Sequence, residues 1–151
     1  KFVAAILYGV SSSVLLALLL GFAGTGLSGL IAAISLGTGL AVTITTLWPV
    51  GKMFPVKMPR FNGFEWAAII LFALFSLRAF LWLIFRDRDV IRVLSPNNLG
   101  DMSLHITYIR QLANGAALWP ENPIYAGAKL TYPLGIDLFN SLLTLLGVDL
   151  I

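Results

Sequence analysis

The sequence contains no cysteine, a single histidine and few charged residues, and each scarcity excludes a class of protein. Without cysteine there are no disulfides, no thiolate nucleophile and no cysteine-bound zinc. One histidine excludes a metal site built from several histidines within these 151 residues. Charged residues make up 11% of the chain, against roughly 25% in globular proteins. This composition excludes a cytosolic enzyme, a nucleic-acid reader and a disordered tail.

Long apolar runs take the place of the missing charge. Residues 2–48 contain no Lys, Arg, Asp, Glu or His, and the whole chain is 58% hydrophobic with a mean hydropathy of +0.90. An apolar run of about 20 residues is long enough to cross a bilayer core of ~30 Å. The sequence therefore predicts an all-α, polytopic bundle with membrane helices over residues 2–22, 27–48 and 64–85.

Small residues shape the first two predicted spans. Residues 24–29 match the letters G-x-G-x-x-G, but a dinucleotide fingerprint needs a preceding strand, and apolar membrane segments flank this one. We interpret the stretch as a turn with packing glycines. In the second span, Ala33, Ser35, Gly37 and Gly39 have the small-xxx-small spacing that lets helix backbones approach closely.

The connectors predict the orientation in the membrane. Trp48-Pro49 is expected to end the second span, and the connector 50–63 that follows carries Lys52, Lys57 and Arg60 without any acid. Short basic connectors stay in the cytoplasm. The longer loop 86–132 mixes both signs of charge and is predicted to be extracytoplasmic.

Two further segments leave alternatives open. Arg78 interrupts the third span, and it either snorkels to the interface or faces a partner carboxylate or phosphate. Residues 133–151 are predicted to start a further membrane helix, with Asp137 in the first turn, where a negative charge is favourable. Because the chain starts at Lys1 and ends inside this apolar pattern, we expect it to be part of a larger polytopic protein.

The extracytoplasmic loop contains a predicted amphipathic helix over residues 101–114. Met102, Ile106 and Ile109 recur at helical spacing, and Asn114-Gly115 is a typical helix stop. The helix is expected to lie at the membrane surface.

Candidate catalytic residues lie on one face of that helix. Asp101, His105 and Tyr108 are spaced so that their side chains share a face. An aspartate and a histidine one turn apart can share a proton, hold a metal or position a substrate hydroxyl. The alternative is structural, with Asp101 as a helix cap and His105 merely solvated. Farther along, Trp119 and Tyr132 are candidates for stacking on sugar rings or for interfacial anchoring.

The order of these motifs resembles a known family. Gly-Asp and a nearby His, Asn-Gly, Trp-Pro and Tyr-Pro follow a membrane helix in the stretch 64–151, which is similar to the N-terminal part of the polytopic glycosyltransferases of the C superfamily. The resemblance implies transfer of a sugar from a polyprenyl-phosphate donor, with Asp101 taking or orienting the proton of the acceptor hydroxyl and His105 assisting. It departs from the family in its extra hairpin, residues 2–48.

The resemblance also implies binding roles and partners. Tyr108, Arg110, Trp119 and Tyr132 are the expected substrate-binding residues, and the leaving phosphate would be neutralised by Arg110 or by a cation outside these 151 residues. The partners would be the lipid bilayer, the polyprenyl-phosphate sugar and the rest of the chain, not nucleic acid, in a bacterial or archaeal cell membrane. No metal site is predicted. Which cofactor the protein uses, if any, stays open: a divalent cation is one candidate, but these residues do not indicate one. The alternative is a non-enzymatic transporter, or a polymer-export or structural subunit.

Overall fold

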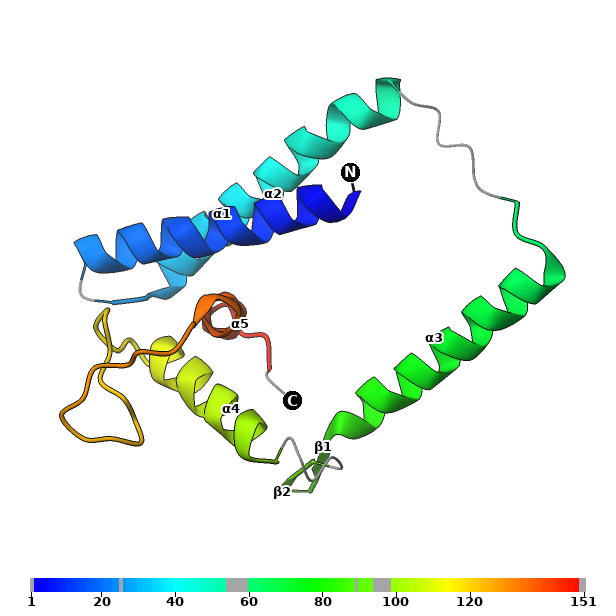
Figure 1. The fold of residues 1–151 in the computed structure, drawn as a ribbon. Coiled ribbons are helices and arrows are strands. Elements are labelled where there is room, and N and C mark those ends of the chain that lie inside the picture. The colour runs from blue at the N-terminus through cyan, green and yellow to red at the C-terminus, as the bar shows by residue number, and fades with distance from the viewer. Residues whose placement is uncertain (1, 25, 54–59, 89, 94–98, 150–151) are drawn as a thin grey trace. The chain divides into compact units, whose positions relative to one another are not determined.

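The computed structural model describes residues 2–24, 26–53, 60–88, 90–93 and 99–149. The chain is mostly helical, which confirms the helical prediction, and it divides into two compact units, residues 1–55 with 103–150 and residues 56–102 with 151. Figure 1 shows the elements in the described ranges. These are α1 (Phe2–Ala23), α2 (Gly29–Met53), α3 (Gly63–Leu83), β1 (Ile84–Asp87), β2 (Val90–Val93), α4 (Leu99–Ala113) and α5 (Gly135–Leu145).

In the first unit, α1 and α2 form a hairpin in which small residues meet. A Cβ added at Gly39 would collide with the Ser13 hydroxyl and the Gly9 carbonyl oxygen, so the two backbones are in contact there. The Ser13 hydroxyl donates to the Gly9 carbonyl (3.0 Å) and the Thr43 hydroxyl to that of Gly39 (2.9 Å), which satisfies both polar groups within the apolar interface. One residue in every four on α1 is buried: Ala5, Gly9, Ser13, Ala17 and Gly21.

Both helices of the hairpin are long and apolar enough to cross a membrane. The 22 residues of α1 span about 33 Å at 1.5 Å per residue. Only 22% of its most apolar stretch and 17% of that of α2 (Gly29–Trp48) are buried. A core helix in a soluble protein is mostly covered, whereas α1 exposes Leu7, Leu15 and Leu19. Within the described residues, most of the surface of these two apolar helices is therefore left uncovered.

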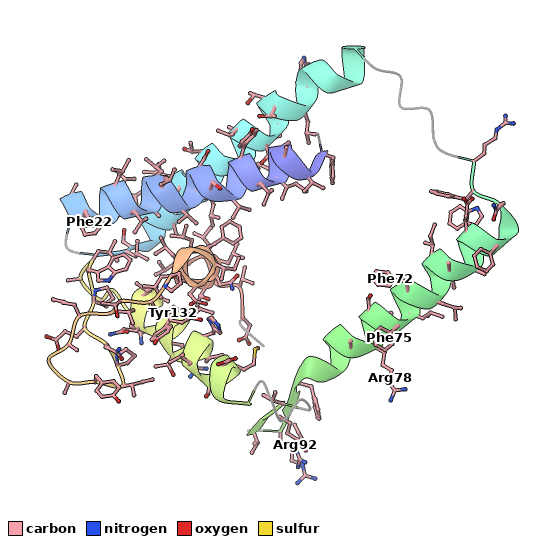
Figure 2. The ribbon with its side chains drawn as sticks, viewed as in Figure 1. Phe22, Phe72, Phe75, Arg78, Arg92 and Tyr132 are labelled. Carbon is pink, nitrogen blue, oxygen red and sulfur yellow. The ribbon has the colours of Figure 1, made fainter. Side chains whose placement is uncertain are left out.

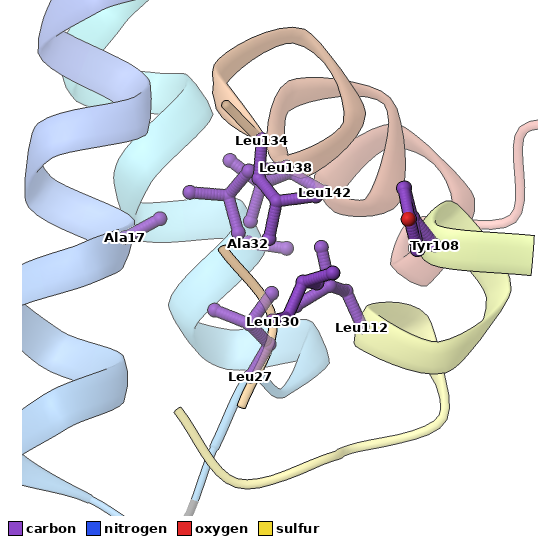
Figure 3. Close-up of a cluster of buried hydrophobic side chains, with 9 residues drawn as sticks. All are labelled: Ala17, Leu27, Ala32, Tyr108, Leu112, Leu130, Leu134, Leu138 and Leu142. Atoms are coloured by element: carbon purple, nitrogen blue, oxygen red, sulfur yellow. The ribbon is translucent and has the colours of Figure 1, made fainter. Parts of the chain in front are cut away.

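A compact core closes the turn end of the hairpin (Figure 3). The core joins α1 and α2 to α4, α5 and the loop between the last two, and each buried leucine contributes about 1.5–3 kcal/mol. Gly26, with a φ of +126°, allows the turn to touch the end of α4, because an added Cβ would lie 2.7 Å from the Ala116 carbonyl oxygen. The cluster consists of Ala17, Leu27, Ala32, Tyr108, Leu112, Leu130, Leu134, Leu138 and Leu142.

The last helix is shorter than the segment 133–151 predicted from the sequence. α5 has 11 residues, about 16 Å, against a bilayer core of ~30 Å. The helix ends in a Schellman motif. The amide of Gly147 (φ +90°) donates to the Thr144 carbonyl, and the amide of Val148 donates to the Leu143 carbonyl. In Figure 1 it is seen nearly end-on while α1 lies across the page, so α5 crosses the hairpin steeply.

The expectation that Trp48-Pro49 breaks the second helix is wrong, because α2 continues to Met53, although the apolar stretch long enough to cross a membrane ends at Trp48. Proline removes one backbone donor but does not by itself end an apolar helix, whose backbone groups are otherwise paired internally. The connector predicted over 50–63 is described only in part, because residues 54–59 lie outside the described residues.

The second unit holds α3 and a small antiparallel hairpin. α3 begins with a capping box, in which Asn62 Oδ1 accepts from the Glu65 amide (2.9 Å) and Glu65 Oε2 from the Asn62 amide (2.8 Å). The Phe61 and Trp66 rings meet edge to face across this start. Arg78, farther along α3, has an exposed side chain (Figure 2).

The strands β1 and β2 correct the all-α prediction, which extended the third helix to residue 85. They pair from Ile84↔Val93 to Asp87↔Val90. Arg88 lies in the turn with a φ of 56°, and Arg92 forms an ion pair of 2.8 Å with Asp87. The β-branched residues of β2 favour an extended strand over a helix.

Candidate functional site

The candidate site lies where α4 meets the start of α5, at the turn end of the hairpin. α4 packs its apolar stripe, Ile109 and Leu112, into the protein and ends at Ala113, next to the predicted Asn-Gly stop. Gly115 has a φ of +79° and donates to the Leu112 carbonyl, which closes the helix. The opposite side of α4 stays open to solvent and carries polar residues.

The central contact of the site joins His105 of α4 to Asp137 of α5. His105 Nδ1 lies 2.9 Å from each carboxylate oxygen of Asp137, 32 residues away in sequence. The Asp137 side chain is only 2% exposed, whereas that of His105 is 30% exposed. A buried carboxylate is strongly unfavourable unless it is paired. Here the histidine pairs it, and the N-terminal turn of α5 adds a favourable dipole.

Two tyrosine rings border this pair. The Tyr132 ring meets that of His105 edge to face, with centroids 5.7 Å apart, and lies 5.5 Å from that of Tyr108. Tyr108 is buried in the core, and burial raises the pKa of its hydroxyl, helped by the neighbouring Tyr132 and Asp137. Tyr132 is 37% exposed, so its ring is accessible from outside beside the histidine (Figure 2).

The structure brings some predicted site residues together and separates others. Asp101 lies in the first turn of α4, which starts two residues earlier, and its side chain is exposed. It is therefore not the N-cap residue of the cap alternative, although an acid in the first turn still favours the helix. Arg110 is exposed on α4, and among the described residues its guanidinium has no ion-pair partner. Tyr108, expected to bind substrate, is buried and belongs to the core cluster.

Trp119 lies apart from the His105 pair and holds the loop in place. Its ring stacks on Phe22, and its indole N–H donates to the Leu130 carbonyl. Gln111 of α4 fastens the same loop by donating to the Glu121 carbonyl (2.9 Å). One face of the Trp119 ring is therefore taken by the protein itself, and the interactions shown by the structure are those of an anchor.

In the described part of the chain, no group of three or more His, Asp or Glu side chains is placed to hold a metal ion. What the arrangement offers chemically is a histidine whose Nδ1 is held by a buried carboxylate and whose Nε2 makes no hydrogen bond to a described residue.

Sequence reasoning missed Asp137 as a site residue. It placed the aspartate at a helix start, where its charge needs no further explanation. The available signal was an aspartate on the buried face of a short apolar helix, between Leu134 and Leu138, because such a carboxylate requires a partner.

No protein-family model, curated protein or solved structure matches the chain.

Proposed function

We propose that this chain is part of an integral-membrane glycosyltransferase of the C superfamily, which moves a sugar from a polyprenyl-phosphate donor to an acceptor hydroxyl on the extracytoplasmic side. One observation carries the proposal. The polar and aromatic cluster around His105 is packed on the turn end of a hairpin whose two helices are membrane-length and apolar outside. A donor with a lipid tail and a polar head presents its reacting bond at such a boundary.

The membrane arrangement follows from the helices. α1 and α2 would cross the bilayer, and α3, with 21 residues and exposed apolar side chains such as Phe72 and Phe75, would be the third span (Figure 2). α5 would lie along the surface, because it is too short to span and crosses the hairpin steeply. Its exposed Ile136 would then face the lipid headgroup region.

The hairpin unit supports the predicted placement of the loop. Because Gly26 touches the end of α4, the turn between α1 and α2 lies on the same side as the loop. If α1 leads into this turn from across the membrane, α2 leads back across it, so the basic connector after α2 lies on the opposite side from the turn. The arrangement is therefore compatible with a cytoplasmic connector and an extracytoplasmic loop.

The roles in the proposed reaction follow the chemistry of each group. The acceptor hydroxyl must lose a proton as it attacks the donor sugar, and His105 and Asp101, one turn apart on α4, are the groups that accept or orient it. Arg110 would stabilise the departing phosphate, because its guanidinium is exposed on the same helix. Tyr132 would contact a sugar ring, with Tyr108 supporting it from the core.

The test is an assay for sugar transfer in membranes that contain the whole polypeptide. The donors are polyprenyl phosphates that carry tritium-labelled hexoses or pentoses. We expect labelled product with the wild-type protein and none above background with a double variant, Asp101→Asn with His105→Asn, at equal protein level. Equal labelling by both proteins would exclude this cluster as the site of transfer. A chelator added to the wild-type reaction would show whether a metal is needed.

A further inference from the structure

We infer that His105 and Asp137 act as a proton-accepting pair toward a sugar hydroxyl of the acceptor, with His105 as the catalytic base and Asp137 as its positioning residue. The inference rests on the proposed transferase function and assigns the proton step to a residue pair that the sequence did not reveal. Asp101 is left with the orientation of the acceptor.

The geometry fixes which nitrogen of His105 is available. Nδ1 lies 2.9 Å from both carboxylate oxygens of Asp137, so it carries the hydrogen that this bond needs. In neutral imidazole the other nitrogen, Nε2, then has a free lone pair. No described residue bonds to Nε2, and 30% of the side chain is exposed, so the lone pair is open to an incoming hydroxyl.

The burial of Asp137 determines which member of the pair can meet a substrate. The carboxylate is almost completely covered, with its neighbours Leu138 and Leu134 in the apolar core, whereas the histidine reaches the surface. A carboxylate in this position stabilises the imidazolium that forms when Nε2 takes a proton, and it holds the ring in one tautomer throughout.

Tyr132 indicates the kind of acceptor. Its partly exposed ring has its centroid 5.7 Å from that of the imidazole and 5.5 Å from that of the Tyr108 ring, to which it is tilted by 42°. A flat aromatic face beside a base suits the apolar face of a pyranose or furanose ring, with one hydroxyl turned toward Nε2. The acceptor is therefore inferred to be a saccharide.

The step balances without a further reagent. The acceptor oxygen forms a bond to the anomeric carbon of the donor sugar while its proton passes to His105 Nε2. The bond between that carbon and the phosphate oxygen breaks, and the polyprenyl phosphate leaves with the electron pair. The proton on His105 then returns to the phosphate or to water, and the pair is restored.

A spectroscopic test reads the pair without any substrate. His105 is the only histidine in these 151 residues, so in protein labelled with ¹⁵N-histidine its imidazole signals are identified as those that disappear in His105→Asn. In nanodiscs, at a pH where the imidazole is neutral, we expect its proton on Nδ1 and none on Nε2, and reaction of Nε2 with diethyl pyrocarbonate. Asp137→Asn should abolish the preference between tautomers. A wild-type ring that carries its proton on Nε2 would overturn the inference.

The kinetic test uses variants that keep the contact between the helices. His105→Asn retains an amide N–H for Asp137 but has no ring nitrogen to accept a proton. We expect a drop in kcat of about 10²–10⁴-fold, an unchanged melting temperature and partial rescue by added imidazole. Asp137→Asn should lower kcat with little effect on KM, and Asp137→Glu should restore part of it. A melting temperature that falls together with kcat, without imidazole rescue, would reduce the pair to a structural link.

The two tests separate this inference from the proposed function. Wild-type membranes that transfer no sugar, with His105 in the expected tautomer, would overturn the transferase function and the saccharide acceptor while the pair still presents a bare nitrogen. Sugar transfer that persists within threefold in His105→Asn would instead overturn the base assignment and leave the transferase function in place.

Discussion

The ring of Phe22, at the end of α1, stacks on the ring of Trp119 in the loop after α4, with centroids 6.3 Å apart and planes 8° from parallel. This contact ties a membrane-length helix directly to the segment that follows the candidate site. Trp119 also donates its indole N–H to the Leu130 carbonyl, so one side chain joins the hairpin, the loop and the approach to α5. The loop is therefore held by specific contacts of Trp119, and removing this side chain should measurably lower the stability of the protein.

Replacing Trp119 should therefore destabilise the protein. Trp119→Ala removes both the stack and the hydrogen bond, and truncations of this kind lower the free energy of unfolding by about 3–5 kcal/mol when the ring is fully buried. Since Trp119 is half-buried, we expect the lower end of that range. Thermal unfolding in detergent provides the measurement. Trp119→Phe should lose less because the stack persists, and an equal loss would show that the ring contact contributes nothing.

The contact between α1 and α2 predicts opposite outcomes at two glycines of the same helix. Gly39→Ala places a methyl group against Ser13 and the backbone of Gly9, whereas Gly37→Ala meets nothing within 4 Å. Overpacking lowers the free energy of unfolding by about 1–3 kcal/mol, so Gly39→Ala should unfold at a lower temperature. Gly37→Ala is the matched control and should be unchanged or slightly more stable. Equal behaviour of the two variants would contradict the contact.

The proposed orientation places the hairpin turn and the loop on one side. Single cysteines introduced at Ala23, Asn62 and Asn122 in this cysteine-free chain report each segment separately. In intact cells, an impermeant thiol reagent should label Ala23→Cys and Asn122→Cys but not Asn62→Cys. Labelling at position 62 alone would reverse the orientation, and labelling at 23 without 122 would separate the turn from the loop.

Tyr108 predicts how the protein responds to alkaline pH. Its pKa is raised above the ordinary value of 10.0 by burial and by the nearby Tyr132 and Asp137, so the folded state holds this proton more tightly than the unfolded state does. The stabilisation is complete below pH 10 and is lost as the pH rises above it. We expect the melting temperature of the wild type to fall more steeply above pH 10 than that of Tyr108→Phe. Tyr125→Phe, at an exposed site, should retain the wild-type slope.

Hydropathy and helix stops gave much of the helical pattern, because these signals are local. The apolar run of residues 2–22 and the Asn114-Gly115 pair correspond closely to α1 and to the end of α4. The end of α5 was missed although its signal is also local, since Gly147 closes the helix from the C′ position. The hairpin of β1 and β2 was missed because an apolar helix and a short strand rich in Val and Ile look alike over four residues.

The candidate site was only partly visible because its main contact is not local. Helical spacing placed His105 near Asp101, whereas its hydrogen-bond partner is Asp137, brought close by the packing of α5. The same limit applies to α1, where the buried stripe around Gly9 and Ser13 became meaningful only against Gly39 of α2. Whether the described helices belong to a polytopic bundle stays a prediction.

The core that closes the hairpin is assembled from distant parts of the chain, with residues 56–102 between them. On the ribosome, α1 and α2 emerge first and can pair through their small residues at once, since both are near in sequence. Leu27 and Ala32 cannot be covered by Leu130 and Leu138 until those later residues have been synthesised. Contacts between distant segments form slowly and leave apolar surface exposed meanwhile. The contact between His105 and Asp137 therefore cannot form before α5 has been synthesised, after both helices of the hairpin.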